Sequence, residues 1–268
     1  LRAWGQYLFG FLMNLQRSAG GHTTYFLGEI SASGWRHYFP VVWLIKEPIP
    51  VLILIALAML LALKQLVNLL LKNRSQVLEL AKREIGEIGM LVFIIGFWGS
   101  SIASHLNIGV RHIFPTLPLI YLLSAKQIKS WQVPMKSKMM VLGVLFLWLL
   151  GEFLFISPNF IAYFNEFIGG PKNAVNYVVD SNLDWGQDLK RLRDFVIKND
   201  IKKIKIDYFG GGDAPYYLGD RYEPLERGKP QKGWLAISAS FLQGGRGRPA
   251  PGHQGECCYY QWLDQYEP

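Results

Sequence analysis

The sequence predicts an α-helical polytopic membrane region of about four transmembrane helices, followed by a small extracytoplasmic α/β domain. Of the 268 residues, 50% are hydrophobic and 18% are charged, and apolar runs dominate up to about Ile156. Charged and turn-forming residues take over after that point. The basic residues of the first part fall largely in short loops between apolar runs, which is the pattern that orients membrane proteins. Two unlike regions therefore share one chain.

The first predicted region, residues 1–48, is aromatic and amphipathic and contains many small residues. Gly20 and Gly21, and then the stretch 31–34, interrupt any long span. Tryptophan and tyrosine favour the boundary between lipid and water. We therefore expect this segment to be an external interfacial loop that lies on the membrane surface.

The second predicted region, residues 49–157, holds the transmembrane helices. About 20 apolar residues, each rising about 1.5 Å, cover the roughly 30 Å hydrocarbon core. The third span is short and contains Pro115 and Pro118, which remove backbone donors and should kink it. The predicted spans cover about residues 49–71, 88–104, 110–125 and 139–156.

The charge pattern predicts an orientation for these spans. The loops at 72–83 and 126–138 are rich in lysine and arginine, so the positive-inside rule places both in the cytoplasm. By alternation, residues 1–48, the turn at 105–112 and the domain from residue 158 onward lie outside. We expect an integral protein of a bacterial cell membrane, with the lipid bilayer as its first partner.

The third predicted region, residues 158–268, follows an α/β pattern. Residues 183–198 carry apolar side chains at helical spacing, and Ser181 with Asp184 would form a capping pair at the start of that helix. Residues 204–209 alternate as a strand does, and residues 234–238 form a second strand-like run. A helix and two strands fit a small layered domain.

The composition argues against two other classes of protein. The net charge of +8 would suit nucleic acid only with a basic face and interleaved aromatic residues, and no such pattern is visible. We therefore expect no nucleic-acid partner. Cys257 and Cys258 are adjacent, so they are poorly placed to pair with each other and lack the ligand spacing of a zinc site.

Polar clusters on the predicted outer side supply the candidate site residues. Arg111 and His112 precede the proline-containing span at head-group level, where an arginine can clamp a phosphate through two hydrogen bonds. Each candidate also has a structural explanation as a helix anchor, a charge pair or a cap. The candidates for a phosphate or donor are Arg111, His112, His105 and Lys46, and those for a substrate are His22, Glu29, Glu47, Asn182, Asp184 and Trp185.

Four strings together resemble a known family. They are YFLGEISASGWRHYFPVVWLIKEPIP, LNIGVRHIFPTLPLIYLLSA, SPNFIAYFNEFIGGPKNAVNYVVDSNLDWGQDLKRL and IKIDYFGGGDAPYYLG. In order and spacing they resemble bacterial polytopic glycosyltransferases of the GT-C fold, related to the dolichyl-phosphate-mannose protein mannosyltransferases (glycosyltransferase family 39-like). The resemblance covers nearly the whole chain, and Arg111 and His112 match the family position in their local string.

This resemblance implies transfer of a sugar from a polyprenyl-phosphate-linked donor to an acceptor on the outer face of the membrane. A carboxylate activates the acceptor hydroxyl, commonly with a divalent metal such as Mg or Mn. In the family these acids lie in the first external loop, which should precede Leu1. We therefore expect a C-terminal fragment and assign neither a catalytic acid nor a metal ligand. The sugar and the acceptor stay open.

Two other classes of function remain open at the level of sequence. A transporter or flippase of lipid-linked sugars usually carries buried charges at mid-membrane and repeated halves, and neither is clear here. A non-catalytic membrane anchor could present an external binding domain. It would leave the gathering of polar residues at the outer ends of the spans without an explanation.

Overall fold

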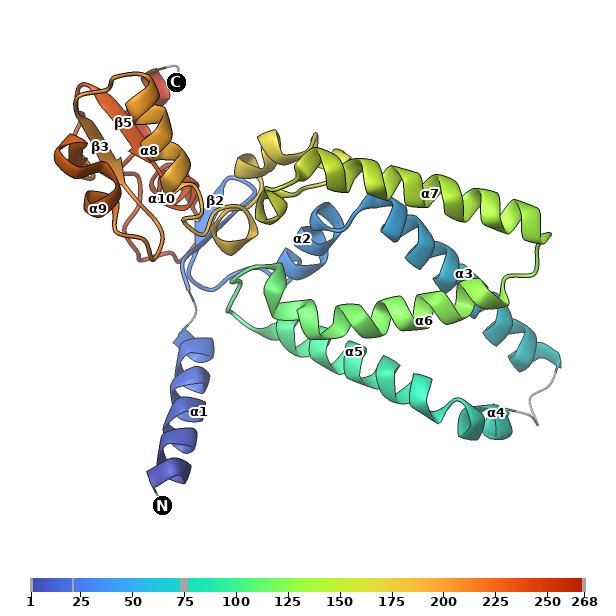
Figure 1. Cartoon of the computed structure of the whole chain (residues 1–268). Coiled ribbons are helices and arrows are strands. Elements are labelled where there is room, and N and C mark those ends of the chain that lie inside the picture. Colours follow the sequence, from blue (N-terminus) through green and yellow to red (C-terminus); the bar gives the residue numbers. More distant parts are fainter. Residues whose placement is uncertain (1, 21, 73–76, 267–268) are drawn as a thin grey trace. The chain divides into compact units, whose positions relative to one another are not determined.

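The computed structural model describes residues 2–20, 22–72 and 77–266 (Figure 1). Leu1, to which the expectation of a fragment refers, lies outside the described residues, as does Pro268. So do residues 73–76 of the predicted cytoplasmic loop. The described chain is mostly helical and carries two three-stranded sheets.

The chain divides into two compact units. The first, here the loop-and-sheet unit, consists of Leu1–Tyr38, Ser104–Gly109 and Gly170–Pro268, and the second, the helical unit, of Phe39–Ala103 and Val110–Gly169. The predicted boundaries at residues 48 and 157 therefore differ from the observed division. The first 38 residues and a short turn join the C-terminal region, because their strands and loops bond to it.

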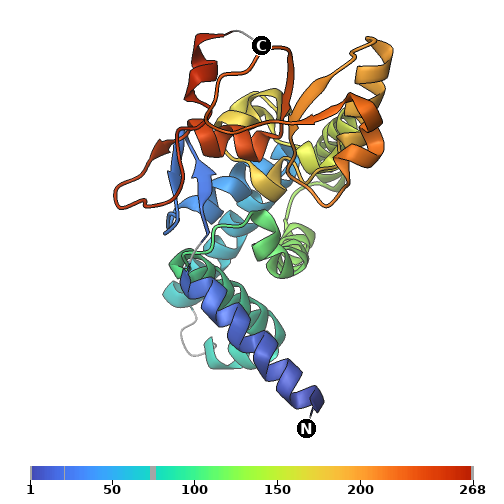
Figure 2. The same cartoon turned by 90° about the vertical axis from the view of Figure 1, so that its left-hand side faces the viewer.

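The loop-and-sheet unit contains two separate sheets (Figure 2). In the first, β1 and β2 form an antiparallel hairpin, and β6 pairs with β2 in parallel. In the second, β3 is central and pairs in parallel with both β4 and β5. The bounds are α1 Arg2–Gly20, β1 Thr24–Phe26, β2 Glu29–Ser31, α8 Leu189–Lys198, β3 Ile204–Asp207, α9 Ala214–Leu218, β4 Tyr222–Pro224, β5 Trp234–Ile237, α10 Ala239–Arg246 and β6 Arg248–Pro249.

The β3 sheet confirms the two predicted strands, with α8 packed on them. Ile204 and Ile206 alternate inward along β3 and join Val196 of α8 in one buried cluster. The predicted helix start and its capping pair were wrong. Helix α8 begins only at Leu189, because the Asp184 carboxylate accepts a hydrogen bond from the Gly186 amide and Gly186 has a φ of 79°, which ends any helical path there.

The segment predicted as an interfacial loop, residues 1–48, is instead largely structured. It contains α1, the β1–β2 hairpin and α2. Leu27 and Gly28 occupy the hairpin turn with φ values of 51° and 89°, the twist that two-residue hairpins require. Many side chains of α1 are exposed aromatic or aliphatic groups, Trp4 and Phe9 among them.

The helical unit is built around α6. Helix α3 packs against α6 and α7, and α5 packs against η2 and α6, so that α6 lies between α3 and α5 (Figure 1). The bounds are α2 Tyr38–Lys46, α3 Ile49–Lys72, α4 Val77–Arg83, α5 Ile85–Ala103, η2 Val110–Thr116, α6 Leu117–Ser130 and α7 Met135–Ile156.

Three helices are long and apolar enough to cross a membrane, namely Ile49–Leu71, Ile85–Ala103 and Met135–Ile156. They match three of the four predicted spans. The span expected at 110–125 is not among them. Pro115 cannot donate to a helical ladder, so the chain forms a 3₁₀ turn up to Thr116, and α6 starts at Leu117 with Pro118 in its first turn, where a proline is tolerated. The remaining α-helix has 14 residues.

A sharp elbow joins α2 to α3. Pro48 and Pro50 have no amide hydrogen, so carbonyls at the end of α2 lose their helical partners. The Asn165 side-chain amide donates to the Leu44 carbonyl at 2.6 Å, in place of the amide that Pro48 lacks, and to the Glu47 carbonyl at 2.7 Å. Its own oxygen accepts from the Phe167 amide at 3.1 Å. Asn165 is 1% exposed, so these bonds form away from water.

We expect Asn165→Ala to destabilise the helical unit, because it leaves two buried carbonyls without donors at a cost of about 1–3 kcal/mol each. Asn159→Ala is the matched control, since Asn159 lies in the same connection, is exposed, and makes no side-chain cap. Thermal unfolding in detergent micelles measures the difference. Equal unfolding temperatures for the two variants would contradict this role for Asn165.

Candidate functional site

Three distant segments meet in the loop-and-sheet unit, at residues 33–38, 105–109 and 181–182, and we call this place the crossing. The Asn107 side-chain oxygen accepts a hydrogen bond from the Trp35 amide at 2.6 Å. The Asn107 carbonyl accepts from the Thr24 hydroxyl at 3.0 Å. His105 Nδ1 donates to the Ser33 carbonyl at 2.8 Å. These bonds fix the turn at 105–109 against the segment after β2.

The third segment closes the crossing from the other side. The Ser181 hydroxyl donates to the Ile108 carbonyl at 2.8 Å. The Asn182 side-chain amide donates to the Tyr38 hydroxyl at 3.0 Å and to the Val179 carbonyl at 3.1 Å. Asn182 and Tyr38 are fully buried. The predicted substrate candidate Asn182 is therefore a structural residue of the crossing.

Two glycines allow the segments of the crossing to approach each other. Gly34 has a φ of 66°, and a Cβ built on it would lie 2.3 Å from the Asn107 side-chain oxygen. Gly109 has a φ of 104°, and its Cβ would lie 2.6 Å from the Ser181 hydroxyl oxygen. No side chain fits at either position without movement. The Asn107 amide nitrogen is buried and has no hydrogen-bond partner among the described residues.

The other substrate candidates do not gather in one site. His22 is exposed, and its carbonyl accepts from the Thr24 hydroxyl. Glu29 of β2 forms an ion pair with Arg248 of β6. Trp185 is 52% exposed. Their role as substrate candidates therefore stays a prediction for each residue by itself.

Asp184 lines a small pocket at the carboxyl ends of β3 and β5. The pocket has a volume of about 220 Å³ and also contains Asp188, Tyr208 and Ser238. Burial raises the pKa of the Asp184 carboxyl, and the Gly186 amide opposes that shift by donating to it at 2.8 Å. Asp188 pairs with Arg191 at 2.7 Å. Crevices at the carboxyl ends of parallel strands are common ligand sites, but this one is narrow and its acids are already bonded.

Lys46 and Glu47, the two charged residues of the elbow, face different surroundings. The Lys46 ammonium donates to the Ile161 carbonyl at 2.8 Å and lies 4.3 Å from the centre of the Phe164 ring. Burial lowers the pKa of Lys46 to about 7. The Glu47 carboxylate is buried and accepts from the Tyr121 hydroxyl at 2.7 Å, and burial raises its pKa.

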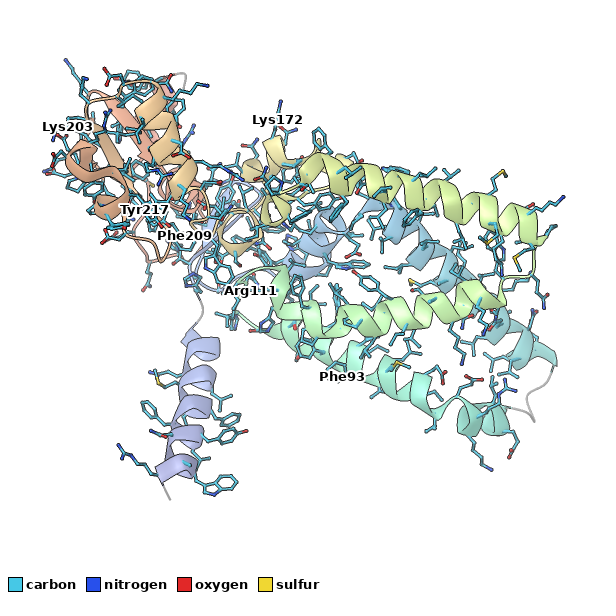
Figure 3. The ribbon with its side chains drawn as sticks, viewed as in Figure 1. Phe93, Arg111, Lys172, Lys203, Phe209 and Tyr217 are labelled. Carbon is cyan, nitrogen blue, oxygen red and sulfur yellow. The ribbon has the colours of Figure 1, made fainter. Side chains whose placement is uncertain are left out.

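Arg111 and His112 lie in η2, at the end of the helical unit where α6 begins (Figure 3). The His112 ring stacks on Phe39 with 5.5 Å between ring centres and lies 6.2 Å from Phe97. His112 is thus held by aromatic packing. Arg111 is half-buried and keeps its place as the phosphate candidate of this unit.

The helical unit also contains an apolar groove between α3, α6 and α7. Its volume is about 660 Å³, within the range of small-molecule sites. Glu47 and Tyr121 lie at one end, and Lys129 and Lys138 at the other. The apolar lining residues include Val51, Leu54, Ile55, Ala125, Ile128 and Leu142. Of the donor and substrate candidates, the groove takes only Glu47. Arg111, His112 and Lys46 are not part of its lining.

The described residues form no evident metal centre. Among the described residues, no three His, Cys, Asp or Glu side chains are grouped so that they could hold a metal ion. Cys257 and Cys258 are free thiols, as their adjacency predicts. We therefore derive no catalytic step through Mg or Mn from the residues of this chain.

No protein-family model, curated protein or solved structure matches this chain.

The residues that build the sites were only partly predictable from the sequence. Asn165 and Tyr121 gave no signal of their own. The pair Pro48 and Pro50 did carry one, since two prolines at a helix end demand a side-chain donor from elsewhere. That demand does not say which residue answers it.

We expect Gly34→Ala to destabilise the crossing more than Gly28→Ala does. Both glycines have positive φ, so both substitutions carry the left-handed penalty of about 1–2 kcal/mol. Only at Gly34 does the new Cβ meet Asn107, which adds an overpacking cost of about 1–3 kcal/mol, whereas nothing lies within 4 Å at Gly28. Thermal unfolding in detergent ranks the two variants. An equal decrease in unfolding temperature for the two variants would contradict the prediction, because it would show that the Asn107 side chain moves aside without cost.

We expect the Lys46 amine to titrate near pH 7, which ¹³C-dimethyl-lysine NMR measures directly. Because the folded pKa lies below the usual value of 10.5, the unfolded chain binds the extra proton between about pH 7 and 10.5. The free energy of unfolding therefore rises with pH across that window, and Lys46→Gln should remove this rise.

Lys172→Gln is the control for this titration, since Lys172 is exposed in the other unit (Figure 3). It should leave the pH dependence of stability unchanged. A Lys46 resonance that titrates with the bulk of the lysines would contradict the desolvated site.

Proposed function

We propose that this chain serves in a membrane glycosyltransferase that takes its sugar from a polyprenyl-phosphate-linked donor. The observation that carries the proposal is the crossing. Residues 33–38, 106–109 and 181–182 come from three of the four strings that resemble the GT-C family, and in this chain they bond to one another. Their meeting supports a common architecture.

The proposed reaction joins the acceptor oxygen to the anomeric carbon of the sugar. The bond from that carbon to the donor phosphate breaks, polyprenyl phosphate leaves with the electron pair, and a carboxylate takes the proton of the acceptor hydroxyl. A cation that stabilises the leaving phosphate would favour this step. None of the acids in this chain is assigned the role of base.

Arg111 suits the leaving phosphate better than Lys46 does. A guanidinium stays charged at every physiological pH and matches a phosphate through two parallel hydrogen bonds. Lys46, with a pKa of about 7, is only partly charged at neutral pH, and its ammonium is already bonded to the Ile161 carbonyl. The sequence placed both residues in the donor group. The structure supports keeping Arg111 first within this proposal.

We expect the purified chain in mixed micelles to bind a polyprenyl phosphate more tightly than the polyprenol of equal length. Quenching of tryptophan fluorescence or native mass spectrometry measures both. Arg111→Gln should weaken phosphate binding about tenfold or more, because a charged hydrogen bond contributes about 1.5–3 kcal/mol. Arg111→Lys should restore only part of it, since a lysine lacks the fork.

Arg2→Gln provides the control, because Arg2 is an exposed arginine of α1, outside both the helical unit and the crossing. It should bind polyprenyl phosphate as the unaltered chain does. Equal binding of polyprenol and polyprenyl phosphate would overturn the proposal of a phosphate donor. Binding that is phosphate-dependent but insensitive to Arg111→Gln would move the phosphate site elsewhere.

A further inference from the structure

The lysine end of the groove between α3, α6 and α7 carries charge that its surroundings do not neutralise. The Lys138 ammonium donates to the Lys129 carbonyl at 3.1 Å, which uses one of its three hydrogens and holds it at the end of α6. Neither ammonium forms an ion pair with an acid in the part of the chain that the structure describes. Lys126, by contrast, is paired with both Glu84 and Glu87.

The other end of the groove has the opposite character. Glu47 lies there with its carboxylate bonded to Tyr121. Tyr121 and Lys129 are eight residues apart on α6, so the two ends are separated by about 12 Å along the helix axis. Between them the groove is lined by aliphatic side chains such as Leu54, Ile128 and Leu142. An occupant should therefore be apolar along its length and anionic at the lysine end.

The surroundings of the groove favour a lipid over a soluble ligand. The groove lies between two of the three helices that are long enough to cross a membrane, and most of the surface of those helices is exposed. Lys129 near the end of α6 and Lys138 near the start of α7 fall within residues 126–138, which the positive-inside rule places on the cytoplasmic side. That leaflet is rich in anionic lipids, and basic pockets between helices on that side bind their head groups.

We propose that this groove binds an anionic phospholipid of the cytoplasmic leaflet, with its phosphate at Lys129 and Lys138 and an acyl chain along α6. The Glu47 carboxylate disfavours the reverse orientation, because it would repel a phosphate placed beside it. The inference rests on the membrane placement of the helical unit and is independent of the proposed sugar donor.

The test uses the full chain and native mass spectrometry, with phosphatidylglycerol and phosphatidylcholine of identical acyl chains as probes. We expect preferential retention of phosphatidylglycerol. The double variant Lys129→Gln/Lys138→Gln should weaken that retention on the order of 30-fold, since each lysine near a head group contributes a factor of about five. Lys136→Gln removes an exposed charge from α7, the helix that carries Lys138. Lys136 does not line the groove, so this variant should have no effect.

A second pair of variants tests the apolar part. Leu54→Trp should fill the groove and reduce retention of both lipids, whereas Leu60→Trp places the same side chain on an exposed position of α3 outside it. Equal retention of the two lipids, or equal loss with Lys136→Gln, would overturn the assignment. The assignment would also be overturned if polyprenyl phosphate competed with phosphatidylglycerol and this competition disappeared in the double lysine variant. Loss of polyprenyl-phosphate binding with Arg111→Gln alone would leave it intact.

Discussion

The structure of the helical unit depends on how the chain satisfies the carbonyls that two prolines leave open at the end of α2. Asn165 donates to one of them, the Leu44 carbonyl, and also to the Glu47 carbonyl, which lies 118 residues earlier in the sequence. With the elbow fixed, consecutive side chains separate: Lys46 turns to Phe164 and the Ile161 carbonyl, and Glu47 turns to Tyr121 in the groove. One buried amide thus positions a base and an acid in different environments, and it accounts for the desolvation that lowers one pKa and raises the other.

A second buried asparagine, Asn107, has a similar structural role in the loop-and-sheet unit. Asn107 is 1% exposed and accepts from the Trp35 amide across 72 residues of sequence. A Cβ at Gly34 would collide with the Asn107 side chain, and a Cβ at Gly109 would collide with Ser181 on the third segment of the crossing. Loops rarely bury polar side chains unless these form hydrogen bonds, because a buried polar group without a hydrogen-bond partner destabilises the folded state. The crossing is therefore a specified structure.

Local sequence patterns predicted the elements whose formation depends on neighbouring residues alone. Hydropathy found the spans at 49–71 and 139–156, and alternation found β3, because burial follows periodicity along one segment. Prediction from these patterns failed where a single residue overrides the pattern. Pro115 does so before α6, and Gly186 does so before α8. The partners of Asn107 and Asn165 lay beyond its reach, since pairing across a hundred residues leaves no periodic trace.

The charge of Glu47 disfavours an anionic group at its end of the groove. A phosphate 4 Å from an ionised Glu47 would meet a repulsion of about 4 kcal/mol at an effective dielectric constant of 20, enough to empty that end of the groove. The raised pKa of Glu47 narrows the pH range of this repulsion but creates no attraction. Under the proposed function, the donor phosphate would therefore bind a cation outside the groove, and Arg111 does not line the groove. If the lysines at the far end bind a phospholipid, as proposed, the two anionic lipids would not compete for one site.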